Sequence, residues 1–598
     1  MALSVACGWV CVAYSVATRC IRVALIPFPN PGRNHAESMD TQRLIQFFAL
    51  GFILLLIWSA WETDYGTPRQ AMEERAEQEQ ARERSENGDD DDVFVPDDLD
   101  AEGPGFTDVD ERQRTEEADS DEEGRDIRVR TDLLDVVINT RGGEIQQVDL
   151  LQHAVSTNDP TPLRLMSTER DRLFTARAGV VTANGVSGPG TRGVYSVDAD
   201  EFELSDGEDR IVVPFVWESD EGLRVTKRYI FHRDSYLIDV EHEVDNATGG
   251  DMRASQQVFL RRSSDYGDGT SWFIYTYTGG VLNSPDSRYE KISFSDMASS
   301  PVDRNISDGW LAIIQHYFLG AWIPPEGEER RYWSRDRGNN VFDFGMNTFW
   351  RPVADGESVD FSSQLFVGPK EQDRLAAAAE HLNLTVDYGW LTIISRPLFI
   401  ALNWIYSVVG NWGFAIIILT LLIKIVFYKL SETSFRSMAR MRKMQPKMQA
   451  LKDRYGDDRQ ALNQALMKMY KEEKINPLGG CLPILVQIPV FIALYWVLLE
   501  SVELRHAPFM LWINDLSSPD PFFVLPLLMG ATMFIQQKLN PAPLDPIQQK
   551  VMMALPFAFT IFFMFFPAGL VLYWVVNNAL SIAQQYVITK RIERGEEK

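Results

Sequence analysis

The chain has 598 residues, a formal charge of -26, 45% hydrophobic residues and four cysteines. Its acid is concentrated, because 26 acidic but only 7 basic residues lie between Glu62 and Asp126. A nucleic-acid-binding protein is excluded, since affinity for phosphate needs clustered Lys and Arg. A disulfide framework is also excluded, because Cys7, Cys11 and Cys20 leave only Cys481 in the body of the chain. Apolar runs of about 18 to 25 residues indicate a membrane protein with a large water-exposed part.

The N-terminal quarter contains three predicted segments. Met39 reads as a natural start, because Arg43 precedes an apolar run over 44–61 and Glu62 follows it. We interpret 1–38 as an upstream extension of the start and 39–61 as an uncleaved transmembrane anchor. A signal peptide or an extra span over 2–17 is the alternative. Residues 62–126 are acidic and poor in aromatics, which predicts a disordered tether.

Residues 127–370 are predicted to form a soluble all-β sandwich. The runs 223–231 and 236–244 alternate apolar and polar residues, as half-buried strands do. Glycine pairs at 142–143 and 279–280 separate such runs, and few helical patterns intervene.

From residue 371 the pattern becomes helical. Residues 371–409 are predicted to be a linker and an interfacial amphipathic helix, since Arg396, Pro397 and Asn403 interrupt its apolar residues. Residues 410–590 should form a core of five spans, with a break at Pro567, and 591–598 a short tail. The five predicted spans cover 410–430, 481–500, 521–537, 551–566 and 569–586. The expected fold is an α-helical bundle of six transmembrane helices with the β sandwich inserted after the first.

The orientation follows from the short loops. Residues 432–474 contain 11 basic and 6 acidic residues, whereas 500–520 is slightly acidic. Basic loops stay in the cytoplasm. Both termini are therefore expected in the cytoplasm, with the β sandwich in the periplasm of a two-membrane bacterium.

Several motifs resemble those of one family. Residues 476–483, NPLGGCLP, followed by QIPVF at 487–491, resemble the signature of the YidC/Oxa/Alb membrane protein insertases. GNWGF at 410–414 and FPAGLVLY at 566–573 fit the same family. TRGG at 140–143 and QHYF at 315–318 point to its Gram-negative form. The departures are the long acidic tether, Lys424 where Arg is usual and Lys429 where Pro is common.

This resemblance implies an insertase and chaperone of the bacterial inner membrane, with no covalent catalysis and no cofactor. Its partners would be nascent inner-membrane proteins, the lipid bilayer, the Sec translocon and ribosomes or targeting factors, without direct binding of nucleic acid. It also implies a hydrophilic groove that opens to the cytoplasm beside an apolar slide.

Lys424 is the centre of the predicted groove, because a charge inside a span is costly unless it is solvated. The candidate groove residues are Lys424, Thr420, Gln487, Trp512, Tyr573, Asn577 and Ser581. Two alternatives remain open. Lys424 could reach the headgroups from a position six residues before the end of its span. The row of Asn577, Ser581 and Gln585 could instead make hydrogen bonds between helices.

The slide would consist of Leu482, Ile484, Leu485, Ile488 and Phe491, unless these only contact lipid or the core. The basic loop, 431–475, is predicted to be a hairpin of two helices, 432–455 and 457–473, with Gly456 at the turn and a kink at Pro446. A stripe of Met438, Met441, Met444, Met448 and Leu451 would form its seam. Its Arg440, Arg442, Lys443 and Lys447 are expected to contact the ribosome or targeting factors.

Enzyme motifs are weak or missing in the sequence. Residues 188–193 fit GxGxxG, but no helix pattern follows and a proline lies inside, so we interpret them as a surface loop. The signatures of P-loop ATPases, HExxH metalloproteases and GxSxG hydrolases do not occur. No metal site is predicted. A membrane-anchored carbohydrate-binding protein and a transporter remain the alternative functions.

Overall fold

The computed structural model describes residues 124–594, except for 185, 191, 265–275, 457, 474–481 and 541–545. The predicted extension 1–38, the first anchor 39–61 and nearly all of the acidic tether lie outside the described residues. Residues 447–474 belong to a separate compact unit, so that unit is described by itself.

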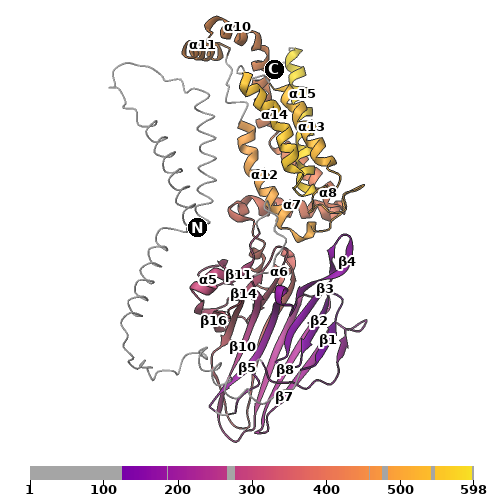
Figure 1. The fold of residues 1–598 in the computed structure, drawn as a ribbon, viewed down its shortest axis with the longest axis vertical. Helices are drawn as coiled ribbons and strands as arrows, with labels where there is room; N and C mark the ends of the chain where they lie inside the picture. The colour runs from indigo at the N-terminus through magenta and orange to yellow at the C-terminus, as the bar shows by residue number, and fades with distance from the viewer. Residues whose placement is uncertain are drawn as a thin grey trace, which may run out of the picture. The chain divides into compact units, whose positions relative to one another are not determined.

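Two β sheets account for the part between Asp126 and Pro369 (Figure 1). The first contains β1 (Asp126–Arg130), β2 (Leu134–Asn139), β3 (Glu144–Ser156), β4 (Asp159–Met166), β5 (Phe174–Ala183), β6 (Glu201–Glu203), β10 (Met252–Ser263), β13 (Asp303–Ser307), β16 (Glu329–Asp336), β17 (Val341–Thr348) and β18 (Arg351–Val353). The second contains β7 (Arg210–Glu218), β8 (Leu223–His232), β9 (Leu237–Asn246), β11 (Gly279–Asn283), β12 (Glu290–Ile292), β14 (Trp310–Ile314), β15 (Phe318–Ile323) and β19 (Ser358–Pro369). The predicted all-β part is thus β-rich in the structure.

Strand order and register follow the sequence pattern. The first sheet runs β13-β16-β17-β10-β5-β3-β2-β1-β6, with β18 beside β10 and β4 beside β3, and the second runs β12-β11-β14-β15-β19-β9-β8-β7. The two predicted strands are β8 and β9, which pair antiparallel with Val225 opposite Val244. Alternate residues of β9 are buried, as the period of two requires.

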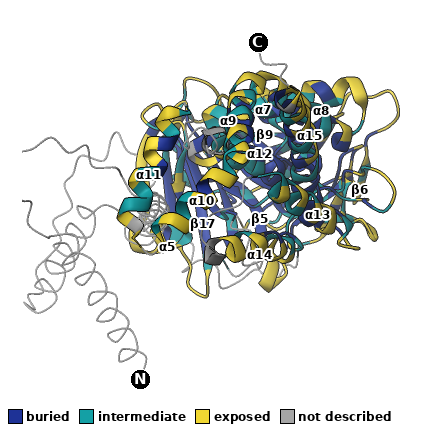
Figure 2. Cartoon of the chain, turned by 90° about the horizontal axis from the view of Figure 1, so that it is seen from above, coloured by how far each residue is buried: buried dark blue, intermediate teal, exposed yellow. Residues whose placement is uncertain are grey.

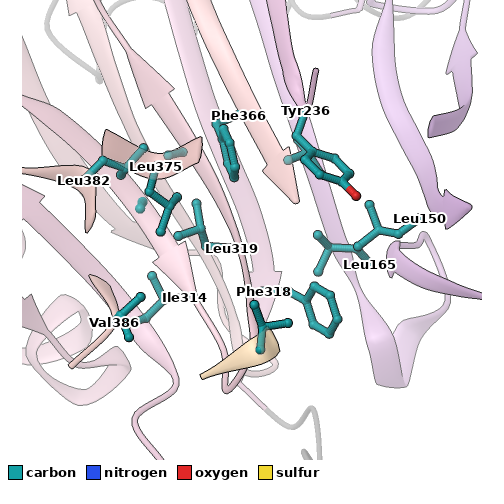
Figure 3. Packing of buried hydrophobic residues seen from close by; sticks show 14 of the residues in the cluster. Leu150, Leu165, Tyr236, Ile314, Phe318, Leu319, Phe366, Leu375, Leu382 and Val386 are labelled. Carbon is teal, nitrogen blue, oxygen red and sulfur yellow. The ribbon is translucent and has the colours of Figure 1, made fainter. Parts of the chain in front are cut away.

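The core of the β domain consists of apolar side chains from both sheets. Strands β5 and β17 are almost entirely buried (Figure 2). Figure 3 shows part of this core, with Ile314, Phe318, Leu319 and Phe366 from the strands and Leu375, Leu382 and Val386 from the segment that follows β19. That segment includes the short helix α6 (Gln372–Ala378), so the core extends beyond the last strand towards the helices.

The C-terminal part is helical. Its helices are α7 (Thr392–Val409), α8 (Trp412–Val426), α9 (Tyr428–Lys443), α10 (Gln445–Tyr455), α11 (Arg459–Glu472), α12 (Leu482–Glu500), α13 (Val524–Leu539), α14 (Pro546–Phe563) and α15 (Ala568–Glu593). Gly410, with φ 67°, ends α7 in the left-handed conformation, and the Asn411 side chain then caps α8 by accepting a bond from Phe414 N. The predicted break at Pro567 separates α14 from α15.

The predicted count of spans is not reached in the described residues. Within the described part of the chain, α7 is the one helix that is both long and apolar enough to cross a membrane. The helices α8 and α9 would together be long and apolar enough as one span, but they are bent by 69°. Two of the predicted spans are short as helices: α8 has 15 residues, about 22 Å at 1.5 Å per residue, and α13 has 16. The described apolar parts of α12 and α14 cover Gln487–Glu500 and Gln549–Phe563. The interfacial position proposed for the helix before Gly410 stays a prediction.

The hairpin also differs from the prediction. We expected one helix over 432–455, whereas α9 begins at Tyr428, directly after the bend that ends α8, and a second break at Met444 separates α9 from α10. Pro446 supplies the reason for the second break, since proline cannot donate its backbone hydrogen bond. Gly456 forms the predicted turn with φ 54°.

Candidate functional site

A row of polar side chains connects α8, α15 and α12. Lys424 Nζ donates a hydrogen bond to Ser581 Oγ at 2.8 Å, and this hydroxyl donates to Asn577 O at 2.7 Å. The Asn577 side-chain oxygen accepts a hydrogen bond from Gln487 Nε2. Four of the seven predicted groove residues therefore lie together. We call these four residues, Lys424, Ser581, Asn577 and Gln487, the polar row.

The polar row is only partly shielded. Ser581 is buried, whereas Lys424, Asn577 and Gln487 are half-buried. Lys424 lies two residues before the end of α8 instead of six before the end of a span, because the helix stops at Val426. Its ammonium group nevertheless binds a hydroxyl of another helix, so the side chain is directed towards α15.

Tyr573 lies near one end of the polar row. Its side chain is buried, and its hydroxyl lies near Gln487. The Tyr573 ring stacks on Phe491 with centroids 6.1 Å apart, and Phe491 also meets Trp574 edge-on at 4.5 Å. Aromatic packing thus holds α12 against α15 beside the polar groups.

Thr420 and Trp512 do not contact the polar row. Thr420 is 1% exposed and donates its hydroxyl to Ile416 O of its own helix at 2.6 Å, a common way to satisfy a threonine inside a helix. Trp512 lies in the segment between α12 and α13, where its indole nitrogen donates to Asp520 at 2.9 Å. That segment contacts the start of α15, roughly 20 Å of helix rise from Ser581.

The proposed slide is described in part. The side chains of Leu482, Ile484 and Leu485 lie outside the described residues. Ile488 is exposed, as a sliding surface requires. Phe491 instead packs against α15, which agrees with the alternative of a core contact.

A second polar face of α15 joins another helix. Asn578 Nδ2 donates to Thr532 Oγ1 of α13 at 3.3 Å, and Gln585 Nε2 donates to Asn540 just after that helix at 3.1 Å. All three members of the predicted row therefore bond to another helical segment, as the alternative of hydrogen bonds between helices expects: Ser581 to α8, Asn577 to α12 and Gln585 to the residue just after α13. Ser581 and Asn577 also belong to the polar row. Sequence reasoning missed Asn578, although its place beside Asn577 was a visible signal.

The basic residues of the hairpin have different surroundings. Lys443 Nζ donates to Ile592 O at 3.0 Å, so it caps the C-terminal end of α15. Phe435, Ala439, Ile588 and Ile592 form an apolar cluster there, with Met438 packed against it. Arg440 and Arg442 are exposed.

The separate unit contains the rest of the hairpin. Within it, Lys447 pairs with Glu473 at 2.7 Å, and Tyr470 approaches Met448 Sδ at 4.0 Å. The predicted methionine seam is therefore divided, since Met448 faces α11 whereas Met438 packs near the end of α15. The break at Met444 ends α9 before Met448, so the two methionines belong to different helices.

A junction between the β domain and the helices was not predicted. The His316 ring donates from Nε2 to Leu499 O at 3.0 Å, and Arg505 donates to Ala154 O at 2.8 Å. Lys370, directly after β19, pairs with Glu500. Burial lowers the pKa of His316 to about 4 and also lowers the pKa of Lys370. The QHYF motif was the one signal of this junction in the sequence.

Glu503 is a half-buried acid at this junction. Its pKa is raised to about 7, first by burial and further by the neighbouring Glu371 and Asp373. Among the described residues, no group of three His, Cys, Asp or Glu side chains could hold a metal ion. The chemistry of the polar row is hydration and hydrogen bonding, because it pairs a cation with hydroxyl and amide groups.

Two family models match the chain. The model described as YidC periplasmic domain matches residues 126–401, and the model described as 60Kd inner membrane protein matches residues 404–596. The chain is 55% identical over 556 residues to the membrane protein insertase YidC of Alkalilimnicola ehrlichii, which covers 93% of this chain and 96% of that protein. It is 52% identical over 570 residues to the YidC of Thioalkalivibrio sulfidiphilus, covering 94% and 100%.

Solved structures are more distantly similar. A structure titled as an active YidC insertase with the first transmembrane domain resolved has a TM-score of 0.36 and 18% identity, over 78% of this chain and 93% of that chain. A galactose mutarotase related enzyme from Lactobacillus acidophilus has a TM-score of 0.29 and 10% identity, over 41% of this chain and 97% of its own.

Proposed function

The chain belongs to the YidC family of membrane protein insertases, and we propose that the polar row is where its clients enter the membrane. The protein is an insertase of the inner membrane, and its substrates are nascent membrane proteins in contact with the lipid bilayer. The observation that carries the proposal is the bond from Lys424 to Ser581, which directs a cation towards a neighbouring helix.

The polar row supplies a physical route for a short hydrophilic segment. Moving an unpaired polar group into hydrocarbon costs several kcal/mol, and a hydrated path with hydrogen-bonding side chains lowers this cost. Burial of the client's own apolar helix, at roughly 25 cal/mol per Å², provides the driving force without nucleotide. The exposed Ile488 supports a path for that helix on the neighbouring face of α12. Leu482, Ile484 and Leu485 would extend this path.

The proposed topology has six spans with both termini in the cytoplasm. The excess of basic residues over 432–474 supports a cytoplasmic hairpin, because basic loops stay in the cytoplasm. The family model for residues 126–401, that of a periplasmic domain, supports the opposite side for the β domain. In this topology α7 lies in the interface, where its exposed Trp404 and Ile400 would meet lipid.

Thiol reactivity tests whether the polar row is hydrated. In a background without other cysteines, Gln487→Cys should react with a small charged maleimide, because thiolate forms only where water reaches it. Ile425→Cys is the matched control, since Ile425 is exposed next to Lys424 but apolar. Thr420→Cys should react poorly even when the groove is wet, because this residue is buried. Equal lack of reaction at positions 487 and 425 would contradict the proposal.

Substitution of Lys424 tests the role of its charge. Lys424→Arg should retain insertion, whereas Lys424→Ala should slow the insertion of clients with acidic translocated tails, because the attraction between charges is strengthened where the local dielectric is low. Clients with uncharged tails serve as the control. Normal insertion of every client by Lys424→Ala would mean that Lys424 only extends to the headgroups.

We also propose that the hairpin recruits ribosomes or targeting factors and that the protein works alone or with the Sec translocon. Reversal of Arg440, Arg442 and Lys443 to Glu should weaken cosedimentation with translating ribosomes, more at low salt than at high salt. Lys443→Glu alone is the necessary control, because Lys443 also caps α15. Unchanged binding at every salt concentration would exclude this surface from recruitment.

The two alternative functions lack support. The relatives that match over nearly the whole chain carry the name of an insertase. A carbohydrate-binding role would rest on the weak likeness to the mutarotase-related enzyme alone. No described feature of the chain favours a transporter.

A further inference from the structure

The segment between α12 and α13 presents a compact apolar surface that the insertion mechanism does not use. Met510, Leu511, Phe522 and Phe523 are all exposed, and Leu511 and Phe522 are 78% and 65% exposed. Trp512 lies between them, with its ring 6.4 Å from that of Phe522. We call these five residues the outer apolar patch.

The patch is held in a fixed arrangement. Ile513 N donates to Met510 O at 3.2 Å and Phe523 N donates to Asp520 O at 3.1 Å, which closes two tight turns. The bond from the Trp512 indole to Asp520 joins these turns. The buried side chains of Ile513 and Leu516 pack into the hydrophobic core. Leu516 O also accepts a bond from Gly569 N at the start of α15 at 2.9 Å.

The backbone of the patch is unfavourable for the residues that it carries. Leu511 has φ 57° and Phe523 has φ 56°, in the left-handed region that favours glycine. Each bulky side chain therefore has a conformational cost, which internal packing offsets only in part, since Leu511 is 78% and Phe523 43% exposed. Burial of the exposed part against a surface outside the chain would compensate for the rest of this cost.

The position of the patch indicates which surface that is. Arg505, in the same segment, donates to Ala154 O of the β domain, so the patch lies on the side of the helices where the periplasmic domain is attached. Leu527 and Leu528, exposed on α13 just beyond Phe523, continue the apolar surface along a helix of the membrane part.

The chemistry of the patch is purely apolar. No Lys, Arg, Asp or Glu occurs from His506 to Asn514, and Asp520 is turned inward to bond Trp512 and Leu525 N. Arg505 and Asp515 flank this stretch, but Arg505 bonds to Ala154 O and Asp515 accepts from His506 N and Ser517. The mixture of one Trp, two Phe and long aliphatic side chains is typical of segments that lie in the boundary between headgroups and acyl chains.

We propose that the outer apolar patch inserts into the periplasmic leaflet of the bilayer in which the chain is embedded. It thereby fixes the depth of the α12–α13 connection and, through Leu516 and Gly569, the depth of the start of α15. The proposal uses the orientation given above but does not depend on client insertion through the polar row.

Spin labelling tests the proposal on the full chain. Cys7, Cys11, Cys20 and Cys481 are replaced by serine, and a nitroxide is attached to Leu511→Cys or Phe522→Cys. Asn514→Cys and Ser518→Cys are matched controls, because both positions are exposed in the same segment but polar. Phe522 keeps the test valid if a change at Leu511 disturbs its turn, since Phe522 has no left-handed backbone.

The labelled protein is reconstituted in phosphatidylcholine vesicles, with and without phosphatidylglycerol. The measured quantity is the ratio of the label's collision rate with oxygen to its collision rate with a water-soluble nickel complex. This ratio should be several-fold higher for labels at 511 and 522 than for the controls, and it should be the same in both lipid compositions. A label that nickel reaches as freely as at Asn514 would overturn the proposal. Shielding from both reagents would also overturn it, because it would show that protein covers the patch. Client insertion is measured separately, so a failure of the polar row leaves this result interpretable.

Discussion

Lys370 and Glu500 lie 130 residues apart in the sequence, yet the lysine ammonium is 3.5 Å from the carboxylate of the glutamate. Their side chains are only 2% and 7% exposed. Lys370 follows the last strand of the β domain, and Glu500 is the last residue of α12. A buried ion pair thus connects the two parts of the chain.

Breaking this pair on one side should be costly. Lys370→Met leaves a buried carboxylate without its cation, and we expect a loss of about 3 kcal/mol in the free energy of unfolding. The double variant Lys370→Met/Glu500→Leu should recover most of this loss, because neither charge remains. Thermal unfolding in detergent measures both, and Lys429→Met, at an exposed lysine, is the control. A double variant as unstable as the single one would contradict this account.

Acid should loosen the same junction. The pKa values of His153 and His316 are both lowered to about 4, mainly by burial, from an ordinary value near 6.5. Because the unfolded chain binds these protons more readily, stability is full above about pH 6.5 and falls as the pH decreases towards 4. Unfolding temperatures across this range should show the loss. His316→Asn, which can still donate to Leu499 O, should show a smaller dependence on pH.

Gly530 should tolerate no side chain. A Cβ atom there would lie 2.0 Å from Thr560 Oγ1, where α13 and α14 approach closely. Gly530→Ala should therefore lower the free energy of unfolding by about 1–3 kcal/mol, the usual effect of overpacking. Adding Thr560→Ala should restore part of the lost free energy of unfolding, because it removes the hydroxyl that the new methyl group would meet. Gly250→Ala, which meets nothing within 4 Å, should leave the unfolding temperature unchanged.

Gln487 and Asn577 should be energetically coupled. Each alanine substitution removes the same hydrogen bond. The double variant should therefore lose less free energy of unfolding than the sum of the two single variants, by about 0.6 kcal/mol, the typical value for a hydrogen bond between membrane helices. A pair without contact, Gln487 with Gln585, should be additive. Additive losses for Gln487 and Asn577 would mean that their bond contributes nothing to stability.

Local patterns in the sequence predicted what depends on local physics. The alternation of 223–231 and 236–244 predicted β8 and β9, and Pro567 predicted the break before α15. Spacing of four residues placed Asn577 and Ser581 on one helical face, and the cost of a buried charge drew attention to Lys424. The structure brings these three residues together.

What could not be predicted depends on contacts between distant residues. The 69° bend between α8 and α9 falls at Phe427, and no Gly or Pro lies near enough to signal it. Packing of Phe435 and Ala439 against Ile588 and Ile592 holds the second helix in its direction instead. The pair Lys370–Glu500 likewise has no local signature, and the place of Trp512 depends on Asp520.

The polar row can form only after α15 has been synthesised. Lys424 has its hydroxyl partner 157 residues later in the chain, and Gln487 has its amide partner 90 residues later, both on α15. While the ribosome is still making α13 and α14, neither side chain can find these partners. A newly made copy therefore carries an unfinished polar row until its final segment has joined the bundle, and chains shortened before Asn577 would remain permanently in that immature state.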